Sequence, residues 1–318
     1  MPLWRRSGAG LGRSLASLLP LLLALLVAAG PTAAESSPPG ILGEELTFAA
    51  APLQPEPSRL LRDRALARGG QPTWVRYAAW PPPARGHPRI AIVLDDLGLN
   101  AAATMGALDL PAPTTLSFLP YGRSLDAWAF LARARGHEVL LHMPMQPIGP
   151  ERPGPNALRV DLSDAELQRR LKANLDSFTG YVGINNHMGS RFTASAASMA
   201  KIVAPLRRRG LIFLDSRTIG ASRAAAVTRE AGVPTLERDV FLDDVIDRAQ
   251  IARQLDEVEA IARRHGQAIA IGHPHAATLA ELRAWIPSLA EKGLVLVPLT
   301  ALLAPAGTFA FQQAARRP

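Results

Sequence analysis

The sequence predicts an α/β fold in which parallel strands alternate with helices to form a compact, distorted β/α barrel. Short continuous apolar runs such as IAIVL and AIAI have the length of strands that are buried on both faces. Amphipathic helical segments separate these runs, as expected for a parallel sheet covered by helices. About seven or eight such units in residues 89–303 match a small barrel that forms a single catalytic domain.

The elements follow one another in order along residues 89–303. Strands are predicted at 90–94, 115–119, 139–141, 181–184, 211–214, 268–271 and 294–297, with a further candidate at 240–242. Helices are predicted at 125–135, from Ser163 to Leu175, at 198–209, from Asp247 to the residue before Gly266, and at 279–289. Ser163 and Glu166 form a capping-box pattern, and Gly136 and Gly266 are favoured helix stops.

The first 34 residues have the layout of a secretory signal peptide. Three arginines precede an apolar run at 18–29, and Thr32-Ala33-Ala34 offers small residues for cleavage before Glu35. The run is shorter than the ~20 residues of a membrane span, although an uncleaved anchor is the alternative. We therefore expect a periplasmic or secreted protein of the bacterial envelope, with no transmembrane segment after cleavage.

Two further segments flank the predicted barrel. Residues 35–88 are rich in proline and small residues and are predicted to form a linker or loosely ordered arm, with a short helix at 58–67. Residues 304–318 are predicted to be a flexible tail.

Composition limits the chemistry. The chain has no cysteine, which excludes disulfides, thiolate metal sites and cysteine nucleophiles, so any metal ligands must be His, Asp or Glu. The net charge is +8, but the basic residues are not interleaved with aromatic residues that would stack on bases. We therefore expect no nucleic-acid partner.

Four clusters of possible metal ligands follow predicted strands. They are Asp95 and Asp96, His142, His187, and the pair His273 and His275. A single histidine at a strand end is more often structural, but four clusters on the same kind of element favour one site. The C-terminal ends of barrel strands converge on one face, and one Asp with two His is typical of catalytic zinc. The sequence therefore predicts a divalent-metal site, with Zn2+ as the expected ion.

The residue types suggest a division of roles. Asp95 and Asp96 diverge by the two-residue alternation of a strand, so one can bind metal while the other acts as a base, unless both cap a helix. His187 is a ligand candidate unless it bonds to a neighbouring asparagine. Arg217 follows the strand LIFL and either orients a carboxylate, binds an oxyanion or lies on the surface. One of His273 and His275 is a candidate general acid.

These residues, in this order, resemble the motifs of the polysaccharide deacetylases, also called carbohydrate esterase family four. The resemblance covers about residues 89–303 and is closer to the divergent branch found in bacterial envelopes. Asp95-Asp96 is similar to the first motif, in which the first Asp is the base and the second a metal ligand. GHEVLLH resembles the second motif, with His142 as its first histidine. That motif continues with a second histidine four residues later, where this chain has Gln146.

The resemblance implies that His187, in NNHMGS, replaces the missing histidine, so that Asp96, His142 and His187 hold the metal. Arg217 stands in for the arginine that orients the base. AIAIGHPH resembles the last motif, with His273 favoured over His275 as the acid. The family's fold is a distorted β/α barrel, and its activity is metal-dependent N- or O-deacetylation of cell-wall sugars.

Three functions are therefore considered. The leading one is a zinc-dependent carbohydrate deacetylase, a hydrolase of C–N or ester bonds that acts on an acetylated envelope polysaccharide or a peptidoglycan-derived sugar. The second is a non-catalytic envelope module on the same fold that binds a glycan or a cell-wall enzyme. The third is a metal-dependent hydrolase of another ester or amide.

Overall fold

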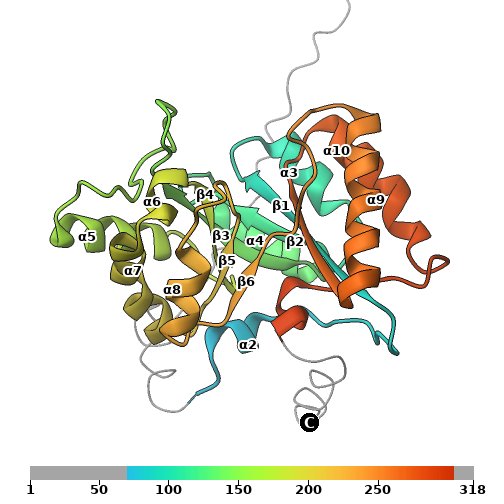
Figure 1. Cartoon of the computed structure of the whole chain (residues 1–318), viewed down its shortest axis with the longest axis horizontal. Coiled ribbons are helices and arrows are strands. Elements are labelled where there is room, and N and C mark those ends of the chain that lie inside the picture. The colour runs from blue at the N-terminus through green and yellow to red at the C-terminus, as the bar shows by residue number, and fades with distance from the viewer. Residues whose placement is uncertain (1–69, 304–318) are drawn as a thin grey trace, which may run out of the picture. The chain divides into compact units, whose positions relative to one another are not determined.

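The computed structural model describes residues 70–303, which form one curled parallel sheet with helices packed around it (Figure 1). The strands are β1 (Arg89–Leu97), β2 (Thr115–Phe118), β3 (Glu138–Met145), β4 (Gly183–Met188), β5 (Ile212–Asp215), β6 (Thr235–Glu237), β7 (Val240–Phe241), β8 (Gln267–Gly272) and β9 (Val295–Leu296). Their order is β6-β5-β4-β3-β2-β1-β8-β7, with β9 paired to β1. Every pairing between these strands is parallel.

The sheet curls because its two edge strands are neighbours in sequence. β6 and β7 lie at opposite ends of the strand order, yet only Arg238 and Asp239 separate them. A two-residue connection can join the two edges only if the sheet bends round on itself. The result is a barrel left open between β6 and β7, which confirms the predicted distorted β/α barrel.

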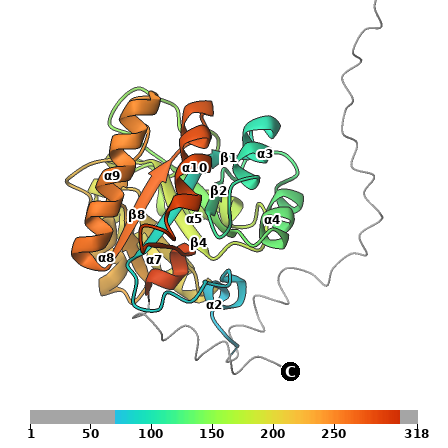
Figure 2. The ribbon, with the colours of Figure 1, turned by 90° about the vertical axis from the view of Figure 1, so that its right-hand side faces the viewer.

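Helices cover the outside of this curled sheet. They are α2 (Thr73–Tyr77), α3 (Ala101–Leu108), α4 (Leu125–Ala134), α5 (Asp164–Leu175), α6 (Ser190–Ala194), α7 (Ala196–Arg209), α8 (Ala224–Glu230), α9 (Arg248–His265) and α10 (Ala276–Ser288), with a 3-10 helix, η1 (Leu299–Leu303). Helices α5 to α8 lie on one side of the barrel (Figure 1), and α3, α9 and α10 lie on the opposite side, which faces the viewer in Figure 2. Within residues 70–303 no helix has both the length and the apolar composition needed to cross a bilayer.

The predicted helix boundaries have local causes that the structure confirms. The side chain of Ser163 accepts a hydrogen bond from the backbone N–H of Glu166, and that of Asp247 accepts one from Gln250. Gly266 ends α9 with a φ of 77°, a left-handed conformation that glycine adopts without steric cost.

The strands read as continuous apolar runs because both faces of the sheet are buried. Ile90 and Ile92 point outward into a core shared with the helices, whereas Ala91 and Val93 point into the barrel. Inside the barrel they join apolar residues of the other strands, and η1 and α2 close the bottom. The lower half of the interior is therefore mostly apolar, with Glu138 and Thr300 as buried polar residues.

Three strands extend well beyond their predicted ends. β1 continues to Leu97, β3 to Met145 and β4 to Met188. The candidate ligands Asp95, Asp96, His142 and His187 therefore lie within strands and not in the loops after them. The prediction stopped at the first polar residue, because a polar side chain inside a barrel looks like the start of a loop. The prediction also omitted α3, α6, α8, β6 and η1, which are short.

Residues 70–88 require a correction, because they are part of the packed fold and not of a loose arm. Trp74 and Tyr77 of α2 pack against the apolar cluster inside the barrel, and the N–H of Trp74 donates to Gly210. Two aromatic rings in five residues supply enough apolar surface to hold so short a helix. The predicted signal peptide, the arm at 35–69 with its helix and the tail at 304–318 lie outside the described residues.

A buried carboxylate ties the bottom of the barrel together. Glu138, at the start of β3, is fully buried. It accepts hydrogen bonds from the hydroxyl of Thr300 (2.5 Å), the N–H of Thr300 (2.9 Å) and the N–H of Ala79 (3.2 Å). Burial raises the pKa of Glu138 to about 7, although these donors oppose the rise.

We expect the pKa of Glu138 to make the protein less stable as pH rises. The pKa of this carboxyl is near 4.5 in the unfolded chain and about 7 in the folded protein, so between these pH values the folded state binds more protons than the unfolded state. The free energy of unfolding therefore falls as pH rises through this range, by roughly 3 kcal/mol. Glu138→Gln, which cannot ionise, should lack this fall. Urea unfolding at pH 4.5 and pH 7.5 measures the difference, and equal pH dependence in both proteins would contradict it.

Candidate metal centre

The two-residue alternation of the strands brings polar side chains to the upper end of the barrel interior. Asp95 continues the inward series of Ala91 and Val93 on β1. On β3 and β4 the inward positions include His142, Asn185 and His187, because His142 pairs with Asn185 and Pro144 with His187. Polar residues from β1, β3 and β4 therefore meet above the apolar core, at the carboxyl ends of the strands.

Asp96 reaches the same place by a break in the strand. Simple alternation would turn it away from Asp95, but the register of β1 against β2 shifts between Leu94 and Leu97, and Asp96 has a φ of 59°. This left-handed conformation costs of order 1–3 kcal/mol in a residue with a side chain. Two other residues near the centre are also left-handed. Met188, the last residue of β4, has a φ of 51°, and Arg217, just after β5, has a φ of 48°. Such backbone strain clusters at functional sites.

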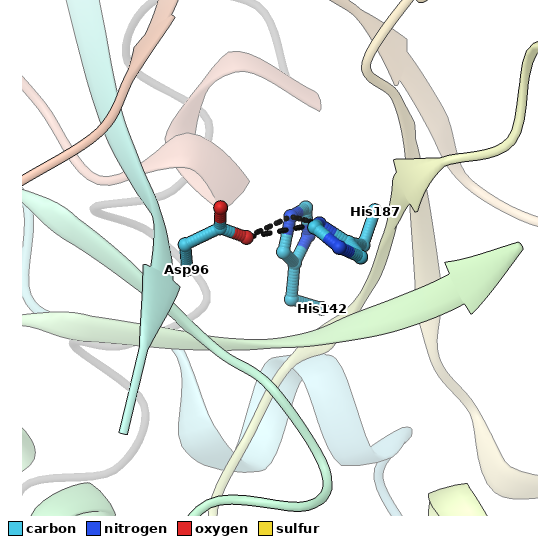
Figure 3. Close-up of side chains that lie close together, drawn as sticks. All are labelled: Asp96, His142 and His187. Atoms are coloured by element: carbon cyan, nitrogen blue, oxygen red, sulfur yellow. Dashed lines mark hydrogen bonds and ion pairs between the residues drawn. The ribbon is translucent and has the colours of Figure 1, made fainter. Parts of the chain in front are cut away.

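Asp96, His142 and His187 converge on one point (Figure 3). Oδ1 of Asp96 lies 2.9 Å from Nδ1 of His187 and 3.3 Å from Nε2 of His142. The two ring nitrogens are 3.2 Å apart. The bond to a neighbouring asparagine considered for His187 does not form, since its Nδ1 faces Asp96 and His142.

These distances fit a bound zinc ion. Ligands bonded at ≈2.0–2.2 Å and separated by about 90–109° lie about 2.8–3.6 Å from one another, which includes all three distances. Oδ1 of Asp96 is buried but has no partner with hydrogen-bond geometry among the described residues, despite the two nearby nitrogens. Figure 3 shows the three side chains turned toward one another. One carboxylate and two imidazoles form a donor set that suits zinc.

The charges around this point also favour a cation. Burial alone would raise the pKa of Asp96, but the two imidazoles outweigh burial and hold that pKa well below its usual range. Burial would lower the pKa of His142, yet the neighbouring Asp95 and Asp96 raise it. The two carboxylates thus make a pocket in which positive charge is stabilised.

Asp95 lies beside this group of three. It is buried, and both of its oxygens accept hydrogen bonds from Nδ2 of Asn185, at 2.9 and 3.0 Å. Its Oδ2 is 3.6 Å from Nε2 of His142. Burial raises the pKa of Asp95 against the attraction of His142 and His273. A carboxylate so placed is suited to accept a proton from a molecule bound at the centre.

His273 approaches from the other side and is held by Asp243. Its Nδ1 is 3.0 Å from Oδ1 of Asp243, and its backbone N–H donates to Oδ2 at 2.6 Å. Its Nε2 is therefore directed at the centre, 3.8 Å from Oδ2 of Asp96. Burial alone would lower the pKa of His273, but the bond to Asp243 and the nearby carboxylates raise it to about 9. The ring holds a proton at neutral pH.

His275 is less constrained. Its ring lies 5.8 Å from that of His273, measured between centroids. Asp243, His273 and His275 are close enough to form a second group of possible ligands. Both oxygens of Asp243 already accept hydrogen bonds, from His273 and from Thr278, so we assign this carboxylate to holding His273.

Arg217 does not bond to Asp95. Its guanidinium pairs with Glu237 at 2.6 Å, and Glu237 also pairs with Arg229. The hydrogen bonds that hold Asp95 come from Asn185 instead. Arg217 remains at the edge of the cavity above the centre.

Gln146, in the place of the family's second histidine, anchors a loop. Its side-chain oxygen accepts a hydrogen bond from the N–H of Val160 (2.9 Å), and its own N–H donates to Leu158. The side chain of Gln146 thus holds the segment that follows β3.

The centre opens into a cavity of about 430 Å³, within the range of small-molecule sites. Asp95, Asp96, His142, His187 and His273 all line it. A neighbouring cavity of about 600 Å³ begins at Asp96 and His273 and extends past His275.

Sequence reasoning missed Asn185 and Asp243 as parts of the site. Asn185 is one of the two asparagines that precede His187, and from the sequence it is only an alternative hydrogen-bond partner for that histidine. Asp243 follows the short β7 in the sequence LDD, the same pattern that marks Asp95 and Asp96. The rule that polar residues after a strand converge on one face would have included it.

The chain is thus a curled parallel β/α barrel with an Asp-His-His group at its carboxyl face that could hold a metal ion. The family model of the divergent polysaccharide deacetylases matches residues 92–303, and the chain belongs to that family.

Similar proteins share this part of the chain. YibQ, an uncharacterized protein of Escherichia coli, is 37% identical over 68% of this chain and 67% of its own length. An uncharacterized protein of Haemophilus influenzae is 36% identical over 64% of this chain and 72% of its own. The crystal structure of an uncharacterized protein from Agrobacterium tumefaciens covers 73% of this chain and 96% of its own, with a TM-score of 0.71 and 34% identity.

Proposed function

We propose that this chain is a zinc-dependent hydrolase that removes acetyl groups from an envelope glycan. The observation that carries the proposal is the convergence of Asp96, His142 and His187, with Asp95 on one side and His273 on the other. A ligand set, a proton acceptor and a proton donor thus share one cavity. Membership in the divergent polysaccharide deacetylase family supports acetyl removal as the reaction.

The ligand atoms would be Oδ1 of Asp96, Nε2 of His142 and Nδ1 of His187. Bound there, zinc supplies a Lewis acid for the acetyl carbonyl and lowers the pKa of water. Both ring nitrogens must be unprotonated to serve as ligands, so each imidazole would carry its proton on the opposite nitrogen.

The chain's own residues would move two protons. As the oxygen of water bonds to the acetyl carbon, Asp95 accepts the proton that this water loses. As the bond from the acetyl carbon to the sugar nitrogen or oxygen breaks, Nε2 of His273 donates a proton to that leaving atom. The products are acetic acid, which ionises to acetate in water, and a free amine or hydroxyl. The proton taken up by Asp95 balances the one given by His273, and exchange with solvent restores both groups. Asp243 keeps His273 oriented through both steps.

We place the substrate in the cell envelope. The proposed substrate is an acetylated polysaccharide or a peptidoglycan-derived sugar, and the support for its location is the signal peptide predicted at residues 1–34. A cell-wall enzyme is proposed as a partner on the same grounds. Mass spectrometry of envelope-fractionated protein should find a mature start near Glu35, and an intact Met1 would favour an uncleaved anchor.

Release of acetate tests the function directly. Purified mature protein should be stripped with a chelator, reloaded with zinc and incubated with a panel of N- and O-acetylated glycans. We expect zinc-dependent acetate release that the chelator abolishes. If the loaded protein binds zinc but acts only on non-sugar esters or amides, it is a different hydrolase. If no substrate yields acetate, the non-catalytic module becomes the better description.

A further inference from the structure

One fully buried amide touches both halves of the site. Asn185 on β4 has no exposed surface. Its Nδ2 donates to both oxygens of Asp95. Its Oδ1 lies 3.0 Å from Nδ1 of His142 and accepts from the hydroxyl of Ser117 at 2.6 Å. Asn185 thus joins the proton acceptor of β1 to a ligand of β3.

The orientation of this amide follows from its partners. An ionised carboxylate only accepts hydrogen bonds, so the NH2 group of Asn185 must face Asp95. The amide oxygen then faces His142, and an oxygen only accepts. Nδ1 of His142 must therefore carry the proton. In a neutral imidazole the other nitrogen then has a free lone pair, and that nitrogen, Nε2, is the one directed at Asp96 and His187.

We propose that Asn185 is the positioning residue of this centre, which selects the metal-binding tautomer of His142 and aims the carboxylate of Asp95. The first effect prepares Nε2 of His142 as a ligand before any ion arrives. The second holds both oxygens of Asp95 against rotation. The effect on turnover rests on the proposed hydrolase function, whereas the effect on the His142 tautomer does not.

Asn185→Ala removes both effects. We expect zinc affinity to fall by about 10–100-fold, the usual loss when a partner of a ligating imidazole is removed. Competition with a chromophoric chelator measures this affinity. In nitrogen NMR spectra of the metal-free protein, at a pH where His142 is neutral, the wild type should show the Nδ1–H form. The variant should lose that preference.

The matched control is Asn174→Ala. Asn174 is also a buried asparagine, but it lies on α5 outside the barrel, where it donates to the carbonyl of Asn156 at 3.0 Å and to the sulfur of Met143, a side chain of the outer core. The Asn174→Ala variant should destabilise the fold without changing the zinc affinity or the tautomer of His142. If both alanine variants weaken zinc binding equally, the effect of Asn185 is one of general stability and the proposal fails.

Asn185→Asp separates the two effects and nearly preserves side-chain shape. Its oxygen can still accept from His142, so the tautomer and zinc binding should persist. Its second oxygen replaces the donor to Asp95, and two carboxylates in contact share a proton at neutral pH. We therefore expect loss of turnover with zinc retained. If Asn185→Ala fails to fold, Asn185→Asp still tests the positioning of Asp95.

The tautomer measurement keeps the proposal independent of enzyme activity. If the wild type neither binds zinc nor releases acetate, the proposed function fails, but a His142 that is Nδ1–H only when Asn185 is present still supports the positioning role. A wild type with His142 in the Nε2–H form, or an unchanged zinc affinity in a folded Asn185→Ala variant, overturns that role.

Discussion

Asp96→Asn is expected to lose zinc, whereas its neighbour Asp95→Asn keeps zinc and loses hydrolysis. Within residues 70–303, Asp96 supplies the only carboxylate oxygen that lies within 4 Å of both imidazoles. Replacing it removes a ligand and a negative charge together, so zinc affinity should fall by more than the ~100-fold seen when an outer partner is lost. Asp95 lies to the side, and its replacement by a neutral amide removes the base. Turnover should then fall by roughly 10²–10⁴-fold.

The two variants control for each other. Each exchanges one oxygen for an NH2 group in adjacent residues, and asparagine tolerates the left-handed backbone at position 96 as well as aspartate does. Zinc content by elemental analysis and turnover at saturating zinc separate the roles. Equal loss of zinc from both variants would mean that Asp95 is a ligand and that the assignment of the base is wrong.

His273→Ala is expected to lower turnover by roughly 10²–10⁴-fold while zinc stays bound. The reason is geometric, since Asp243 holds Nδ1 of His273 and leaves Nε2 facing the centre. A sugar amine is a poor leaving group unless it is protonated, so the loss should be large on an N-acetyl substrate. His275→Ala should have a smaller effect, because Asp243 is committed to His273.

The nature of the leaving group provides the decisive control. A nitrophenyl acetate ester releases a stable anion that needs no proton, so His273→Ala should reduce its hydrolysis much less than that of an N-acetyl sugar. Equal losses on both substrates would exclude the general-acid role. Loss of zinc from the His273→Ala variant would instead identify His273 as a ligand.

Much of the fold was predictable because local patterns cause it. The apolar run at 90–94 is buried on both faces, and the caps at Ser163 and Asp247 act within one helical turn. The prediction failed where local and tertiary signals disagree. Residues 70–88 look like a linker by composition, yet the rings of Trp74 and Tyr77 fill the bottom of the barrel.

The sequence by itself determined which residues could meet. Parallel strands converge at their carboxyl ends, and a period of two sends Asp95 to the same inward face as its apolar neighbours Ala91 and Val93. The candidate ligands Asp96, His142 and His187 were identifiable by type and by place along the chain. These properties depend only on residues that are close in sequence.

Tertiary structure alone decided how those residues are paired. Asp96 joins the centre through a left-handed backbone at the point where the register of β1 against β2 shifts. Arg217 pairs with Glu237 and not with Asp95. Asn185, which is 90 residues from Asp95 in the sequence, donates the hydrogen bonds that hold that carboxylate. A hydrogen bond between distant strands depends on the curl that brings them together, and that curl is a property of the whole sheet. No local segment contains the information.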